Sequence, residues 1–117
     1  MKKKFQDSFH GLKLALGHRA VRIQFILGIM ALIGGLIIRL DHYEWLAFII
    51  CIGMVISMEI MNTAVEKLGD YLNSEYDEKI RTIKDLASAA VLLASFAALM
   101  VCILVLIRRL GWIRINL

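Results

Sequence analysis

Residues 86–107 read LASAAVLLASFAALMVCILVLI, a run of 22 residues that contains no charged side chain. A helix needs about 20 apolar residues to cross the hydrocarbon core of a bilayer. This run therefore predicts a membrane-spanning helix. Ala90, Ala94 and Ala98 recur every four residues along it, and such a stripe of small residues favours close helix packing in lipid.

Two further apolar runs precede this one, at about residues 20–40 and 45–66. Hydrophobic residues make up 60% of the 117-residue chain, and no proline interrupts a helix. In lipid, an isolated segment satisfies its own backbone groups only as a helix. We therefore expect an all-α integral membrane protein, a single domain over residues 1–117 with spans at about 20–40, 45–66 and 86–107.

Glycines in the first run indicate close helix contacts. Gly28, Gly34 and Gly35 would weaken a soluble helix, but in lipid they let a neighbouring helix approach. A short polar turn over residues 39–44 then leads into the second run, where Trp45 suits the membrane interface.

Residues 2–17 predict an amphipathic helix on the membrane surface. Phe5, Phe9, Leu12 and Leu16 recur at spacings of four, three and four, which places them on one helix face. Lysines at the start of the segment suit anionic head groups. The same pattern also fits an ordinary amphipathic helix packed on the rest of the protein.

Basic residues are distributed unevenly about the predicted spans. Ten of them lie in the N-terminal segment and the polar stretch before the last span: Lys2, Lys3, Lys4, Lys13, Arg19, Arg22, Lys67, Lys79, Arg81 and Lys84. Four lie on the other side: Arg39, Arg108, Arg109 and Arg114. The positive-inside bias therefore places the N-terminus in the cytoplasm. Because these residues crowd at the ends of apolar runs, we expect no nucleic-acid binding.

The candidate site lies at the end of the second span. Glu59, Asn62, Glu66 and Asp70 are separated by three, four and four residues, which puts them on one helix stripe about 80° wide. An acidic side chain within the membrane costs about 2.5–3.5 kcal/mol, so Glu59 is a functional candidate. The alternative is that Glu59 lies at the interface and pairs with a neighbour.

Further polar residues lie between this stripe and the third span. Lys84 and Asp85 open that helix, and Ser88 follows one turn later. A lysine there suits phosphate oxygens, although it also suits the membrane edge. Glu75, Tyr76 and Asp77 add oxygen ligands, and such a set suits magnesium held together with substrate phosphates. No phosphate-binding loop, protein-kinase motif or HExxH motif is present.

Two blocks of sequence resemble a known family. The first is EIMNTAVE at residues 59–66, and the second is KDLASAAVLL at residues 84–93. Their wording and separation, with SEY at residues 74–76 between them, resemble the prokaryotic diacylglycerol kinase family, which includes undecaprenol kinases. The likeness covers almost the whole chain.

The resemblance implies an enzyme that phosphorylates the hydroxyl of a membrane lipid alcohol with ATP and Mg²⁺. The acceptor would be diacylglycerol, giving phosphatidic acid, or undecaprenol, giving undecaprenyl phosphate. It also implies a homotrimer with shared active sites, in a multi-pass fold of the bacterial inner membrane, with the site facing the cytoplasm. Glu59 would be the catalytic base and, with Asn62 and Ser88, would bind the lipid. Glu66 would bind the metal, and the nucleotide would contact Glu66, Glu75, Tyr76, Asp77, Lys84 and Asp85.

The sequence departs from the family pattern at the end of the amphipathic segment. Members carry E-x-N-F-R there, and the glutamate is a second metal ligand, whereas this chain reads HRAVR at residues 18–22. His18 would occupy the glutamate position, and histidine is a poor ligand for magnesium. We therefore interpret His18 as an interfacial residue, and leave open whether Glu66 holds the metal alone or Asp7 substitutes.

Two other functions remain compatible with these residues. Buried acids also line ion pathways, so a small cation-conducting oligomer is one alternative. A catalytically weakened family member that acts as a membrane scaffold is the other, because of the altered residue at His18.

Overall fold

The described part of the chain is helical throughout. A computed structural model describes residues 2–72 and 77–111. Within them lie α1 (Lys2–Ala15), α2 (Arg19–Ile38), α3 (His42–Leu72) and α4 (Glu78–Arg109). The last three helices are each long and apolar enough to cross a membrane. The predicted all-α membrane fold, with three spans after an N-terminal helix, is confirmed.

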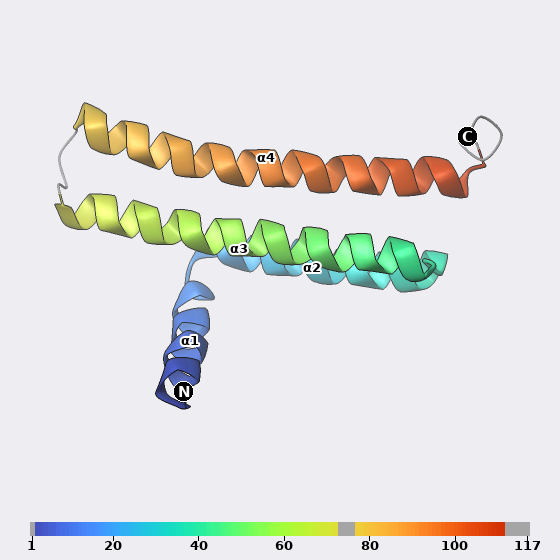
Figure 1. The fold of residues 1–117 in the computed structure, drawn as a ribbon, viewed down its shortest axis with the longest axis horizontal. Coiled ribbons are helices and arrows are strands. Elements are labelled where there is room, and N and C mark those ends of the chain that lie inside the picture. The colour runs from blue at the N-terminus through green and yellow to red at the C-terminus, as the bar shows by residue number, and fades with distance from the viewer. Residues whose placement is uncertain (1, 73–76, 112–117) are drawn as a thin grey trace.

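The helix α3 is the centre of the arrangement. It packs against α2 and, along most of its length, against α4, whereas α1 points away from these three helices (Figure 1). We call the end where α3 finishes and α4 begins the α3–α4 end. The opposite end, with the turn between α2 and α3, is the α2–α3 end. The candidate site residues of α3 and α4 lie toward the α3–α4 end.

The helices differ in length, and this difference sets the depth of the site. At 1.5 Å per residue, the 20 residues of α2 rise about 30 Å, which matches the hydrocarbon core. The 31 residues of α3 and 32 of α4 rise about 46–48 Å. Figure 1 shows this excess at the α3–α4 end. If α3 crosses from His42 with about 20 residues, the stripe starts at the membrane boundary and continues beyond it.

The polar stretch between the last two spans is more helical than its composition suggests. Most of residues 67–85 continue α3 to Leu72 or open α4 at Glu78. Asp77 is the N-cap of α4, and its Oδ1 accepts from the backbone N–H groups of Lys79 and Ile80 at 2.8 and 3.3 Å. Such a cap satisfies N–H groups that the first turn of a helix leaves unpaired, so α4 begins well before its apolar part.

The turn at the α2–α3 end is shorter than predicted, because α3 already begins at His42. Arg39 ends α2 in the left-handed conformation, with φ 57°. Asp41 and Glu44 then form a reciprocal capping box. The Asp41 N–H donates to Glu44 Oε1, and the Glu44 N–H donates to Asp41 Oδ1, both at 2.9 Å.

Two of the three glycines of α2 make the close contacts that the sequence predicts. A Cβ atom on Gly35 would lie 2.8 Å from Leu40 Cδ1 and 2.9 Å from the Trp45 ring. On Gly28 it would lie 2.9 Å from Ile52 Cγ2. The prediction is wrong for Gly34 within the described single chain, where a Cβ atom would meet nothing within 4 Å. Gly34 differs because it lies about 100° around α2 from Gly35, whose face contacts Leu40 and Trp45.

Candidate functional site

The predicted stripe exists because α3 continues without a break past Asp70. Glu59 is its innermost member and is buried, with 8% of its surface exposed. No basic side chain of the described residues forms an ion pair with it; its backbone oxygen accepts from Thr63 Oγ1 at 2.9 Å. Glu59 is therefore a buried carboxylate without an ion-pair partner among the described residues.

Asn62, one turn further along α3, has an acceptor that the described residues leave unused. Its Oδ1 atom is buried, and none of the described donors reaches it. An unsatisfied buried acceptor costs about 1–3 kcal/mol, so a donor or cation supplied from outside the chain is its natural partner. The atom lies on the same stripe as Glu59 and Glu66.

Lys84 of α4 joins the outer part of the stripe. Its Nζ atom lies 2.5 Å from Asp70 Oδ1 and 3.8 Å from Glu66 Oε2. The lysine side chain is 22% exposed, whereas those of Glu66 and Asp70 are 46% and 66% exposed. The structure thus places one cationic group between two carboxylates of the stripe.

Gly69 is a site residue that the sequence analysis missed. It is buried between Lys84 and Ile80 of α4. A Cβ atom at Gly69 would lie 2.7 Å from Lys84 Cε and 3.0 Å from Ile80 Cγ2. The sequence held one indication of this role. Gly69 is a glycine inside a helical pattern, directly before Asp70, the last carboxylate of the stripe, and such a glycine often marks a close contact.

The remaining predicted residues of α4 have other surroundings. Asp85 pairs with Arg81 on its own helix, at 3.4 Å, and both side chains are about two-thirds exposed. Ser88 is exposed one turn later. The carboxylate of Asp77 caps α4. The predicted nucleotide contacts Glu75 and Tyr76, like Ser74 and Arg114, lie outside the described residues.

The oxygen atoms of the stripe fit a hard cation only in part. Among residues 2–72 and 77–111, no three histidine, cysteine, aspartate or glutamate side chains form a metal cluster. The Glu66 carboxylate and the unused Asn62 oxygen are donors of the kind that Mg²⁺ prefers when phosphates supply other ligands. His18 is the N-cap residue of α2, with no side-chain capping bond. The donor set therefore suits a cation that arrives with phosphates.

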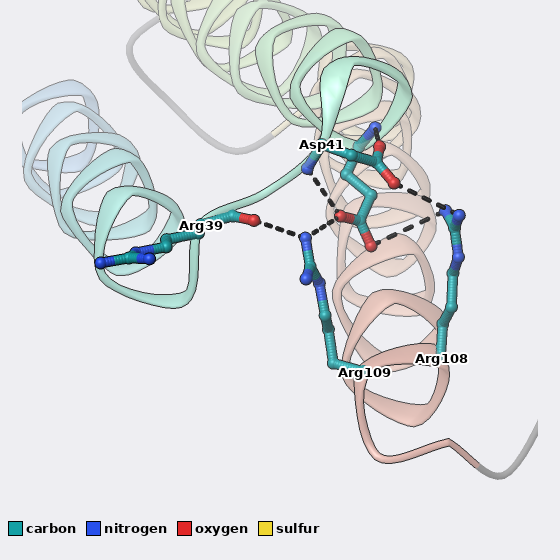
Figure 2. Close-up of polar contacts among 5 residues, drawn as sticks. Arg39, Asp41, Arg108 and Arg109 are labelled. Carbon is teal, nitrogen blue, oxygen red and sulfur yellow. Dashed lines mark hydrogen bonds and ion pairs between the residues drawn. The ribbon is translucent and has the colours of Figure 1, made fainter.

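A second polar cluster lies at the α2–α3 end, and the sequence analysis did not foresee it (Figure 2). Arg109 donates to Glu44 Oε1 and to the Arg39 backbone oxygen, each at 2.6 Å. Arg108 lies 3.2 Å from Asp41 Oδ2 and 3.8 Å from Glu44 Oε2. We call these five residues the arginine–carboxylate cluster. It ties the end of α4 to the turn between α2 and α3.

The cluster affects the titration of Asp41. The backbone N–H of Glu44 is the largest cause that lowers the pKa of Asp41 below its ordinary value of 3.8. Partial desolvation opposes this effect, and the guanidinium groups of Arg108 and Arg109 add to it. The Asp41 carboxylate is therefore held in its charged form by a helix cap and two cations.

Comparison with known proteins supplies the function of this architecture. The family model described as prokaryotic diacylglycerol kinase matches residues 6–106. Diacylglycerol kinase of Escherichia coli (strain K12) is 32% identical over 99 residues, covering 83% of this chain and 81% of that protein. A Sinorhizobium diacylglycerol kinase is 31% identical over 85 residues, or 73% of this chain and 62% of that protein. Undecaprenol kinase of Bacillus subtilis (strain 168) is 28% identical over 79 residues, which cover 68% of this chain and 64% of that protein.

Proposed function

This chain belongs to the prokaryotic diacylglycerol kinase family and is a membrane-embedded lipid kinase, and we propose that its acceptor is the hydroxyl of diacylglycerol or undecaprenol. The main structural support for the site is the contact of Lys84 with Glu66 and Asp70. These two carboxylates belong to the stripe whose innermost member is the buried Glu59. A lipid hydroxyl at the membrane boundary and a nucleotide beyond it can both reach this stripe.

Glu59 is the proposed catalytic base. Its carboxylate accepts the proton of the lipid hydroxyl while that oxygen bonds to the γ-phosphorus of ATP. The bond between the γ-phosphorus and the bridging oxygen breaks, and ADP leaves with that electron pair. Burial of Glu59 without a basic partner among the described residues supports this role, because its charge is not already neutralised. We assign Asn62 and Ser88 to the lipid, since both lie within about one turn of the ends of the predicted spans at 45–66 and 86–107.

The outer part of the site is proposed to hold the nucleotide. Lys84 faces the phosphates as a cation, and Glu66 holds the metal. When bound, Mg²⁺ would neutralise phosphate charge during transfer. Four further residues complete the proposed nucleotide contacts. Asp77 and Asp85 are among the described residues, whereas Glu75 and Tyr76 are not. Phosphoryl transfer depends mainly on positioning and charge stabilisation, which is what this collection of residues offers.

The assembly and orientation belong to the same proposal. Many apolar side chains of the three spans are exposed in the single chain, and a homotrimer with active sites between subunits would cover part of them. The excess of lysine and arginine around α1 and the α3–α4 end supports a cytoplasmic site in the bacterial inner membrane. Residues 1–117 then act as one kinase domain.

The test is transfer of labelled γ-phosphate from ATP to lipid in mixed micelles, with and without Mg²⁺. Diacylglycerol and undecaprenol are compared by kcat/KM, and wild type is compared with Glu59→Gln. Glu78→Gln, which removes an exposed acid of α4, is the matched control. We expect product in wild type and control, and a loss of at least about 100-fold in Glu59→Gln. Unchanged activity in Glu59→Gln would refute the assignment of Glu59 as the catalytic base. Cation flux in proteoliposomes without ATP consumption would favour the channel alternative.

A further inference from the structure

We propose that Asp70 and Gly69 are positioning residues that fix the Lys84 ammonium beside Glu66, ready for the nucleotide phosphates. This inference rests on the proposed function and deepens it, because it concerns how the nucleotide side of the site is built. Neither residue is assigned to contact the substrate. They act through Lys84.

The distances identify Asp70 as the main partner of the lysine. Lys84 Nζ lies 2.5 Å from Asp70 Oδ1, within hydrogen-bond distance, but 3.8 Å from Glu66 Oε2, beyond it. An ammonium group has three donors. One is used by Asp70, so donors remain for a phosphate without loss of the anchor. Glu66 lies near the same ammonium group, where it would hold a metal ion that arrives with the phosphates.

A lysine needs such an anchor because its charge sits on a flexible four-carbon stem. Gly69 restrains the stem, and Asp70 restrains the tip. The Lys84 Cε atom passes over Gly69 so closely that a Cβ atom there would lie at 2.7 Å. Glycine is unfavourable inside a helix, yet at this position it lets the lysine stem lie against the backbone of α3. The lysine stem is thereby directed toward Asp70, the residue that follows Gly69 on α3.

The pair is also placed to set the register of α3 and α4. Lys84 and Asp70 are separated by 14 positions along the chain, on opposite sides of the connection between the helices. A shift of either helix by one residue would break the bond. The geometry of the site therefore depends on the Lys84–Asp70 bond, although Asp70 is not assigned a contact with the reacting groups.

The first experiment separates binding of nucleotide from the chemical step. Asp70→Asn removes the anchoring charge, and Gly69→Ala displaces the stem while Asp70 is retained. We expect both to lower kcat/KM for ATP by about 10- to 100-fold, mainly through KM, with KM for the lipid unchanged. Asp70→Glu should recover part of the loss. The matched controls are Gly53→Ala, also on α3 with nothing within 4 Å of the added Cβ atom, and Glu78→Gln.

The second experiment observes Lys84 without catalysis. The purified protein reacts with an amine-acylating ester, and peptide mass spectrometry follows Lys84 and, as internal reference, the exposed Lys79. A lysine whose side-chain nitrogen is engaged by a carboxylate is less available to the reagent, so Asp70→Asn should raise the Lys84 rate several-fold and leave the Lys79 rate unchanged.

The two results separate the inference from the function on which it rests. Equal Lys84 rates in wild type and Asp70→Asn would overturn the inference, as would an unchanged KM for ATP in both variants of an active enzyme. If wild type transfers no phosphate to either lipid, the proposed function fails. The acylation rates then still decide whether Asp70 holds Lys84.

Discussion

Arg109 donates to the buried carboxylate of Glu44 across 65 positions of sequence, at 2.6 Å. The Glu44 side chain is only 3% exposed, and the same oxygen accepts from the Asp41 N–H of the capping box. The bond therefore closes α4 onto the first turn of α3. The bond lies at the end of the bundle opposite the candidate site. Substitutions there should therefore change the stability of the fold without removing a residue of the candidate site.

Glu44→Gln should destabilise the protein by about 1–3 kcal/mol, because it leaves two arginines without a buried counter-ion. The measurement is the unfolding midpoint in a denaturing-detergent titration. Arg81→Gln is the control, since its partner Asp85 is exposed and such surface pairs contribute about 0–1 kcal/mol. Equal midpoints for the two variants would show that the cluster contributes no stability.

Acidification should weaken the arginine–carboxylate cluster. The folded pKa of Asp41 is lowered, so its charged form adds stability that is complete above the ordinary value of 3.8. That stability is lost as the pH falls through 3.8 toward the lower folded pKa. We expect wild type to lose stability below about pH 4 more steeply than Asp41→Asn, in thermal unfolding monitored by circular dichroism. Parallel pH profiles would contradict the assigned role of this carboxylate.

Adjacent glycines of α2 should respond in opposite ways to the same substitution. Gly35→Ala forces a methyl group against Leu40 and Trp45 and should cost about 1–3 kcal/mol. Gly34→Ala meets nothing within 4 Å and should be neutral or stabilise α2 by up to about 1 kcal/mol. Unfolding midpoints of the two variants provide the test. A larger loss in Gly34→Ala would place a neighbouring subunit against that face.

Asp77 has a structural role that can be separated from its proposed nucleotide contact. Asp77→Ala removes the N-cap of α4 and should cost about 1 kcal/mol, whereas Asp77→Asn keeps a capping oxygen and should cost only a few tenths. Stability is measured by thermal unfolding, and KM for ATP is measured in parallel. We expect KM to rise in Asp77→Asn at unchanged stability; an unchanged KM would restrict Asp77 to capping.

Local features of this chain could be predicted, because helical periodicity is a property of neighbouring residues. The stripe from Glu59 to Asp70 needed only the spacing and a continuous helix. The capping box of Asp41 and Glu44 has equally local spacing, but both residues were assigned to the turn. The start of α4 at Glu78 was missed because composition, not capping, defined the span.

Contacts between helices could not be predicted in the same way. The bond from Lys84 to Asp70 and the bond from Arg109 to Glu44 both depend on the register of α3 against α4. That register is set by side-chain packing along the two helices, for which the sequence has no simple period. The role of Gly69 follows from the same register, since the Lys84 stem and the Ile80 side chain of α4 together exclude a side chain there.

The short length of α2 also has a consequence for the membrane around the protein. Its 20 residues match a hydrocarbon core of about 30 Å, with a left-handed Arg39 at one end and the link to α1 at the other. The helices α3 and α4 have residues to spare, but α2 does not. Lipids with longer acyl chains would therefore create a hydrophobic mismatch at α2 first, and thinner bilayers would be met by tilt. A change in bilayer thickness would therefore act first on α2 and on its link to α1.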